Sequence, residues 1–146
     1  MKYEQIKQVF TDLDKLKQDG IWFSGIEGEG EYKEWWKNGQ LWTHCFYKQG
    51  NKIGEYKRWW RNGQLMTHCF YNGQGSKEGE FKEWGYSRQL LVHCFYRGIK
   101  DNYGVIFYQG KNDKRFKGEY KQYGDDGKLE KHIIFNNDGS IKEKIL

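Results

Sequence analysis

Residues 30–47 read GEYKEWWKNGQLWTHCFY, and closely similar stretches return at 54–71 as GEYKRWWRNGQLMTHCFY and at 79–96 as GEFKEWGYSRQLLVHCFY. A looser copy, GEYKQYGDDGKLEKHIIF, occupies residues 118–135. Similarity at a nearly constant spacing is typical of repeat proteins, in which each copy is one supersecondary unit. We therefore predict a single continuous array over residues 21–146. Its units are expected at 30–53, 54–78, 79–103, 104–117 and 118–146, with the fourth, beginning GVIFYQG, cut short.

The composition favours a thin sheet over a thick globule. The 146 residues are 36% hydrophobic and 18% aromatic, with a mean hydropathy of −1.06. Tryptophan, tyrosine and phenylalanine tolerate a half-exposed position better than aliphatic side chains do. No apolar run approaches the about 18 residues of a membrane span, and MKYEQIKQVF lacks the apolar block of a secretory signal. We expect an intracellular, cytoplasmic protein, with the virion as the alternative for a chain of viral origin.

The three cysteines, Cys45, Cys69 and Cys94, occupy equivalent positions in three copies. Two strands per unit would place them roughly 10 Å apart. That separation exceeds the Cα limit of about 7 Å for a disulfide. Reduced thiols are therefore expected, as in intracellular proteins.

An N-terminal helix is predicted over residues 2–19, within a capping segment 1–20. Apolar residues recur there at spacings of three and four, and Gly20 follows as a stop signal. The apolar stripe of this amphipathic helix would cover the end or one face of the first strands.

Each copy divides into two strand-like runs around a central turn. In the first copy the runs are 31–36 and 41–47, separated by Lys37-Asn38-Gly39. Asn-Gly is a strong hairpin signal because both residues tolerate positive φ. The third copy has Ser87-Arg88 at this place, and arginine is poor at positive φ. We therefore expect that turn to move toward Gly85-Tyr86. A final turn at 137–139 precedes an expected last strand over 140–146.

The register decides which side chains share a face. A two-residue loop would place Trp36 opposite Leu41, whereas a three-residue loop would place Trp35 there. We prefer the second, because the Trp35 position is aromatic in every long copy. One face is then expected to carry Trp35, Leu41, Cys45 and Tyr47, and the other Tyr32, Trp42, His44 and Phe46.

The wording G-E-Y-K-x-W-W-x-N-G-Q-L followed by F-Y resembles MORN repeats over roughly residues 28–135. It is closest to the variant seen in bacterial antitoxin-like proteins, and W-W-x-N-G-Q-L-x-x-H-C-F-Y also resembles repeat proteins of large DNA viruses of amoebae. The resemblance implies a mainly β fold, an elongated, twisted single sheet of successive antiparallel hairpins. It also implies a non-catalytic role in bridging proteins, dimerising or contacting membrane lipids. The cut-short unit and Arg88 depart from the pattern.

The sequence predicts neither a catalytic nor a metal site, and no cofactor. His44, His68, His93 and His132 share one repeat position, and three of them precede a cysteine. Neighbours on a strand point to opposite faces, so a His-Cys pair cannot hold one zinc ion or work as nucleophile and base. Glutamates at 31, 55, 80 and 119 and lysines at 33, 57, 82 and 121 are read as alternating charge rows on a solvated face.

Two surfaces are predicted to bind partners. The first is an aromatic ladder, favoured as an interface because Trp and Tyr are common at binding hot spots. Its members are Trp35, Trp59, Trp84, Tyr123, Tyr47, Tyr71 and Tyr96. The second is a basic segment with a local charge of +4 from six basic and two acidic residues, a candidate for anionic surfaces. Its basic members are Arg97, Lys100, Lys111, Lys114, Arg115 and Lys117.

Three functions are expected from these features. The leading one is a structural or scaffold protein that self-associates, as a dimer, or binds another protein through the aromatic face or an end strand. The second is binding of membrane lipid or nucleic acid through the basic segment. The third, an antitoxin-like inhibitor, rests on the resemblance alone.

Overall fold

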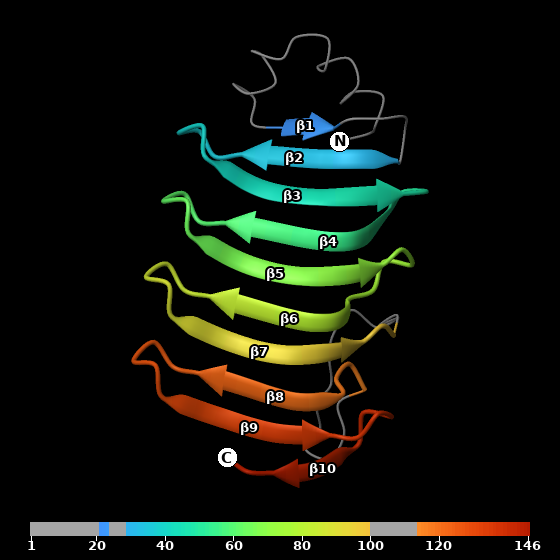
Figure 1. The fold of residues 1–146 in the computed structure, drawn as a ribbon, viewed down its shortest axis with the longest axis vertical. Coiled ribbons are helices and arrows are strands. Elements are labelled where there is room, and N and C mark those ends of the chain that lie inside the picture. The colour runs from blue at the N-terminus through green and yellow to red at the C-terminus, as the bar shows by residue number, and fades with distance from the viewer. Residues whose placement is uncertain (1–20, 24–28, 100–113) are drawn as a thin grey trace.

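A computed structural model describes residues 21–23, 29–99 and 114–146 of the protein. These residues form ten strands in one antiparallel sheet, in which every strand pairs with its neighbours in sequence (Figure 1). The strands are β1 (Ile21–Phe23), β2 (Gly30–Trp35), β3 (Leu41–Lys48), β4 (Asn51–Trp59), β5 (Leu65–Asn72), β6 (Glu78–Trp84), β7 (Leu90–Arg97), β8 (Gly118–Tyr123), β9 (Leu129–Phe135) and β10 (Ile141–Lys144).

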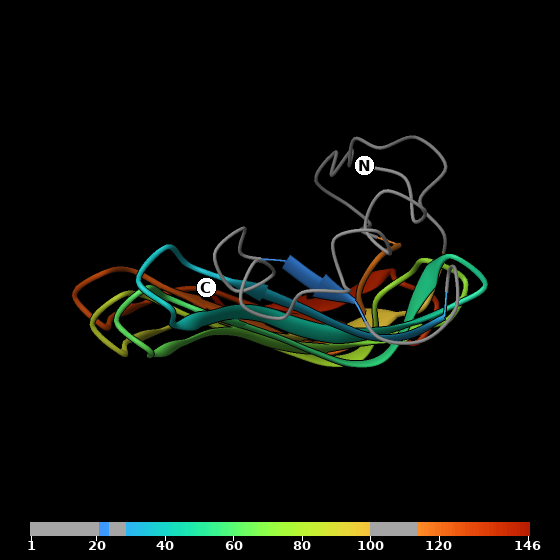
Figure 2. The ribbon, with the colours of Figure 1, turned by 90° about the horizontal axis from the view of Figure 1, so that it is seen from above.

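The strands lie in a single curved layer, which is seen from above in Figure 2. The described residues contain no helix, and thus no helix long and apolar enough to span a membrane. The helix predicted at 2–19 lies outside the described residues, and so does most of the cut-short unit 104–117. The mainly β, single-sheet architecture predicted from the repeats is confirmed.

Each long copy forms one hairpin, and the four hairpins are β2–β3, β4–β5, β6–β7 and β8–β9. The last of these continues the array directly, because β7 pairs with β8 through Val92–Gln122 and His93–Lys121. The expected final strand is also present, as β10 after a turn that Asn136 and Ser140 close.

The hairpin turns have three residues, as predicted. In the first, the Trp36 amide donates to the Gln40 carbonyl and the Gly39 amide to the Trp36 carbonyl, and Gly39 has φ 87°. Trp35 is consequently the Cα partner of Leu41. Asn38 does not need positive φ, contrary to the reasoning from Asn-Gly, because among described non-glycine residues only Gln49 and Arg88 have it.

The turn asparagines instead join one hairpin to the next. Asn38 accepts a hydrogen bond from the Gln40 amide at 2.9 Å and donates one to the Arg61 carbonyl at 2.9 Å. Asn62 repeats both contacts, with the Gln64 amide and the Tyr86 carbonyl. The indole of Trp36 adds a bond to the Trp59 carbonyl, at 2.9 Å. The motif W-W-x-N-G therefore ties adjacent hairpins together at their turns.

The predicted shift of the third turn is wrong. The Gly85 amide donates to the Gln89 carbonyl and the Arg88 amide to the Gly85 carbonyl, in the same pattern as the other turns. Arg88 occupies the glycine position with φ 71°. The pairing of Trp84 with Leu90 fixes the loop at three residues, so the backbone accepts the unfavourable φ.

The predicted faces are partly wrong because each hairpin contains a β-bulge. In the first, Glu34 pairs with Thr43 and Trp35 with Leu41, so Trp42 is the extra residue. From Thr43 onward, each side chain of β3 therefore points to the face opposite the one expected without the bulge. Tyr32 therefore pairs with Cys45, with which it was not expected to share a face.

The bulge also brings Trp42 to the side of Thr43 and Cys45. Its ring stacks on Trp36, with centroids 4.5 Å apart, and lies 5.4 Å from the guanidinium of Arg58. Arg58 is the Cα partner of Thr43, which identifies the side. Trp35 and Leu41 lie on the opposite face, which also carries His44 and Phe46.

The core lies on the face of the cysteines, here called the cysteine face. Each cysteine is the Cα partner of an aromatic residue on the other strand of its hairpin: Cys45 of Tyr32, Cys69 of Tyr56 and Cys94 of Phe81. All three cysteines are free and only 1% exposed. The small thiol fits between larger rings, so a single layer buries it without a second sheet among the described residues.

Replacing Arg88 with glycine is expected to stabilise the protein by about 1 kcal/mol, because glycine adopts positive φ without steric cost. The matched change Gly39→Arg should destabilise by a similar amount, since a Cβ at Gly39 meets no atom within 4 Å and only the φ is unfavourable. Urea unfolding midpoints at constant m-value measure both changes. Equal stability of Arg88→Gly and wild type would contradict the strain at this turn.

Candidate interaction surface

The face opposite the cysteines carries two charged rows, and we call it the Glu–His face. The Lys–His row runs without interruption across eight strands from β2 to β9. Within hairpins its pairs are Lys33–His44, Lys57–His68, Lys82–His93 and Lys121–His132. Between hairpins they are His44–Lys57, His68–Lys82 and His93–Lys121.

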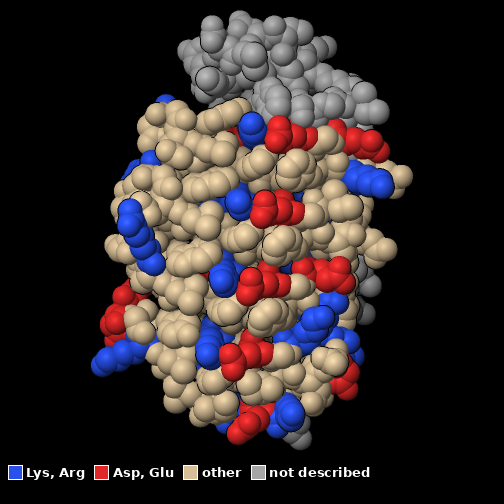
Figure 3. Space-filling view, viewed as in Figure 1, with Lys and Arg blue, Asp and Glu red and all other residues tan. Residues whose placement is uncertain are grey.

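The Glu–Phe row lies beside it, two residues away along each strand. Its pairs are Glu31–Phe46, Glu55–Phe70, Glu80–Phe95 and Glu119–Ile134. Figure 3 shows basic and acidic side chains side by side at successive levels down the middle of the visible face. The charge rows predicted from the sequence are therefore present as rows.

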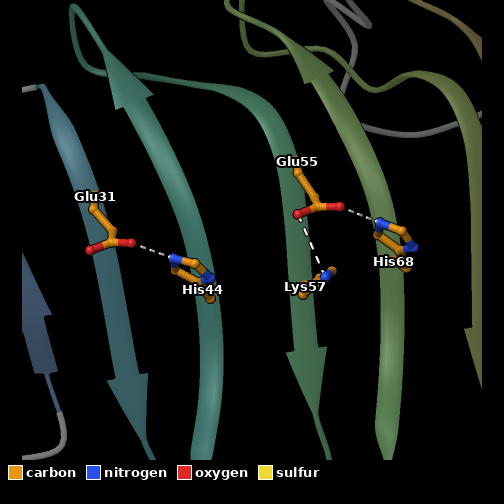
Figure 4. Close-up of polar contacts among 5 residues, drawn as sticks. All are labelled: Glu31, His44, Glu55, Lys57 and His68. Atoms are coloured by element: carbon orange, nitrogen blue, oxygen red, sulfur yellow. Dashed lines mark hydrogen bonds and ion pairs between the residues drawn. The ribbon is translucent and has the colours of Figure 1, made fainter.

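Every histidine of the row contacts a glutamate of its own hairpin. The Nε2–Oε2 distances are 2.8 Å for His44–Glu31, 2.9 Å for His68–Glu55, 3.0 Å for His93–Glu80 and 3.1 Å for His132–Glu119. Lysines join three of these pairs, for example Lys57 at 3.6 Å from Glu55 (Figure 4). These Glu–His contacts were not predicted from the sequence, although the constant separation of 13 residues between the partners could have indicated them.

These contacts lower the pKa of the carboxyl groups. The pKa values of Glu55, Glu80 and Glu119 fall below the ordinary glutamate value, chiefly because a histidine hydrogen-bonds the carboxylate. With the histidines neutral, four glutamates balance the four lysines of the two rows. The two rows thus combine dense charge with no net charge.

No cluster of three or more His, Cys, Asp or Glu residues suited to a metal ion occurs among the described residues. The register shows why the histidines and cysteines do not combine. His44 pairs with Lys33, whereas Cys45 pairs with Tyr32 on the other face. The predicted opposition of each His-Cys pair is confirmed.

The predicted aromatic ladder divides between the two faces. Tyr47, Tyr71 and Tyr96 lie on the cysteine face, with ring centroids 5.7, 5.4 and 5.4 Å from those of Tyr32, Tyr56 and Phe81 respectively. Trp35, Trp59, Trp84 and Tyr123 lie on the Glu–His face, each paired with a leucine beyond the bulge. They are half-buried there.

Exposed phenylalanines give the Glu–His face an apolar component. Phe46 is 38% exposed and Phe70 is 37% exposed. Each ring packs against the histidine two residues before it, with ring centroids 5.2 Å apart for His44–Phe46 and 5.3 Å apart for His68–Phe70. Large apolar side chains repeated on one regular face are typical of an interaction surface.

Lysine side chains cover the rings of the cysteine face. The ammonium of Lys52 lies 5.1 Å from the Tyr56 ring and 5.2 Å from the Tyr71 ring. Lys77 repeats the arrangement over Phe81 and Tyr96. Such cation–π contacts let the aliphatic stems shield the aromatic layer while the charged groups reach water.

The basic segment is partly used in holding the fold. Arg97 donates from Nε to the Asn137 carbonyl at 2.7 Å and from a terminal nitrogen to the Lys114 carbonyl at 2.9 Å. The Arg115 guanidinium stacks 4.6 Å from the Phe116 ring. Lys114 and Lys117 are exposed, whereas Lys100 and Lys111 lie outside the described residues.

The MORN repeat variant model matches residues 28–49, 52–72 and 116–137. Each matched segment corresponds to one hairpin of the sheet: β2–β3, β4–β5 and β8–β9. These three segments are MORN repeats of the variant type. A comparison with curated proteins finds no significant match.

The third hairpin is a MORN-like unit in structure without matching the family model. Its strands β6 and β7 pair as the others do, including the bulge before Trp84. Its turn differs from that of the first copy, because Gly85, Ser87 and Arg88 stand in place of tryptophan, asparagine and glycine. The MORN hairpin geometry therefore survives loss of the turn motif.

Arg97→Lys is expected to cost about 1–2 kcal/mol of stability, because lysine keeps the charge but cannot reach both carbonyls with two planar donors. Lys117→Gln, at an exposed position, should change stability by less than about 0.5 kcal/mol. Thermal melts compare the two. An unchanged melting temperature for Arg97→Lys would show that the two hydrogen bonds contribute nothing.

The stability of the protein is expected to fall as the pH rises above about 9. Burial raises the pKa of Cys45 and Cys69 to about 11 and of Cys94 to about 12. Unfolded thiols ionise first, so by pH 10 each costs on the order of 1 kcal/mol.

Urea unfolding at pH 8 and pH 10 measures this loss. Cys69→Ala removes one ionising thiol, so its loss between the two pH values should be smaller than that of wild type by on the order of 1 kcal/mol. An identical pH dependence in the two proteins would show that the buried thiol is not the cause.

Proposed function

We propose that this MORN repeat protein is a non-catalytic interaction protein that self-associates. The observation that carries the proposal is the Glu–His face, which repeats exposed phenylalanine and paired charges along the sheet. Phe46 and Phe70 are both more than one-third exposed on strands in the interior of the sheet order. Exposed rings on a rigid strand lose little conformational entropy on binding, which favours association.

The chemistry of the faces supports a role without catalysis. Each glutamate of the Glu–Phe row contacts a histidine, and the same arrangement recurs in four hairpins instead of converging on one place. The cysteines lie on the opposite face, and their raised pKa keeps the thiols protonated near neutral pH. Neither arrangement offers an activated nucleophile next to a base.

The C-terminal end strand is a less favoured route to self-association. β10 carries Lys142, Glu143 and Lys144 in four residues. Charged side chains, lysine above all, discourage pairing at an exposed sheet edge. The Glu–His face therefore carries the proposal in preference to the C-terminal edge.

An anionic surface is a second candidate partner, favoured by the exposure of Lys114 and Lys117. Arg97 and Arg115 have structural contacts, which leaves fewer charges for binding than the sequence suggests. Salt-dependent binding to vesicles with anionic lipid would support this candidate.

Light scattering over a range of protein concentrations is expected to give a dimer mass for the wild-type chain. Phe70→Ser should weaken the dimer by roughly tenfold or more, since a buried interface ring contributes more than about 1 kcal/mol. Ile99→Ser is the matched control, because Ile99 is 44% exposed but lies outside the strands. A monomer at every concentration would overturn the proposed self-association.

A further inference from the structure

We propose that the Glu–His face takes a second copy of this chain, related by a two-fold axis along the direction in which the strands stack. The Lys–His row of each copy then lies over the Glu–Phe row of the other. This inference rests on the proposed self-association and specifies which surface and which orientation it uses.

The geometry of the two rows makes the face self-complementary. Along β4 the order is Glu55, Lys57, Trp59, so the acidic row, the basic row and the tryptophan positions run side by side. Residues two apart on a strand are roughly 6.6 Å apart. A rotation about the stacking direction exchanges left and right and keeps each strand at its level. It therefore places glutamate over lysine.

The alternating residues fit the same arrangement. On the strand next to Glu55 and Lys57, the two rows carry Phe70 and His68. The rotation that places Glu55 over the lysine row of the partner therefore places Phe70 over its histidine row at the next level. Within each hairpin both rows lie on the same two strands, about 4.8 Å apart, so one alignment satisfies both strands of the hairpin.

The other two-fold orientation is unfavourable. A rotation about the strand direction keeps each row on its own side, so no glutamate meets a lysine. With the axis on a strand it places lysines over lysines and glutamates over glutamates, and with the axis between two strands it places lysine over histidine and glutamate over phenylalanine. Like charges brought together across an interface cost several kcal/mol. Charge thus selects one orientation, and the resulting interface is isologous, as in most dimers.

The overlapping rows make a small interface. Eight strands at about 4.8 Å span roughly 34 Å, and the two overlapping rows span roughly 13 Å including their side chains. The resulting area of roughly 450 Å² per partner is below the about 800 Å² of a standard interface, as in weak complexes that depend on protein concentration. Two sheets so placed have their strands nearly aligned, which is one of the two common ways in which sheets pack.

Charge reversal on one row and then on the other tests whether these two rows form the interface. Lys57→Glu with Lys82→Glu makes both rows acidic over two hairpins, and Glu55→Lys with Glu80→Lys makes them basic. Each variant alone is expected to dimerise at least 100-fold more weakly than wild type. An equimolar mixture should form a one-to-one heterodimer within about tenfold of the wild-type affinity, because opposite rows face each other again.

The control for the acidic variant is Lys37→Glu with Lys128→Glu. It changes the net charge as Lys57→Glu with Lys82→Glu does, but at exposed turn positions, and it should dimerise like wild type. Thermal melts establish that the variants fold, and the single variants Lys57→Glu and Glu55→Lys provide the same comparison with a smaller perturbation. Mass by light scattering and sedimentation is the measurement.

The outcomes separate this inference from the proposed self-association. Wild-type dimers that persist unchanged in both reversed variants, or reversed variants that remain monomers when mixed, would overturn the row-on-row arrangement while leaving self-association through another surface. A wild-type monomer at all concentrations would overturn both. Recovery only in the mixture supports the inference.

Discussion

The β-bulge beside each turn is the constraint on which the two faces depend. In a hairpin with the same loop but no bulge, Tyr32 and Cys45 would lie on different faces of the sheet. The extra residue in β3 instead aligns Tyr32 with Cys45 and returns Trp35 and Leu41 to the side of His44. Because the bulge recurs in these four hairpins, the cysteines gather on one face with their tyrosine or phenylalanine partners, and the Glu–His contacts gather on the other with Trp35, Trp59, Trp84 and Tyr123.

A single sheet can have a core when its side chains are matched in size across the strands. The small thiols next to Tyr32, Tyr56 and Phe81 leave room for a second row of rings on this face. Tyr71, for example, packs against Tyr56. Met66, Phe116, Ile133 and Phe135 extend the buried set. Leucine in place of Cys69 would overfill this space, which explains why a sequence poor in aliphatic residues suits the fold.

The sequence predicted the hairpins and the loop length because both depend on local patterns. Turn residues, alternating aromatics and a constant spacing are visible within 18 residues. The bulge and the conformation of Arg88 depend on pairing between strands, which no local pattern expresses. The same holds for Trp36 and Asn38, whose side chains contact carbonyls about a repeat away. The division of the aromatic ladder follows directly from the unforeseen bulge.

The order of the strands determines how the sheet would respond to force. Every strand pairs with its neighbour in sequence, and β1 and β10 lie at opposite ends of the stack (Figure 1). Tension between these ends would act along the hydrogen bonds and load the ladders in series, so that one ladder opens before the next. The side-chain bridges from Asn38, Asn62 and Arg97 cross the boundaries between hairpins. Under load the ladders would therefore open one after another, and the sheet would not fail all at once.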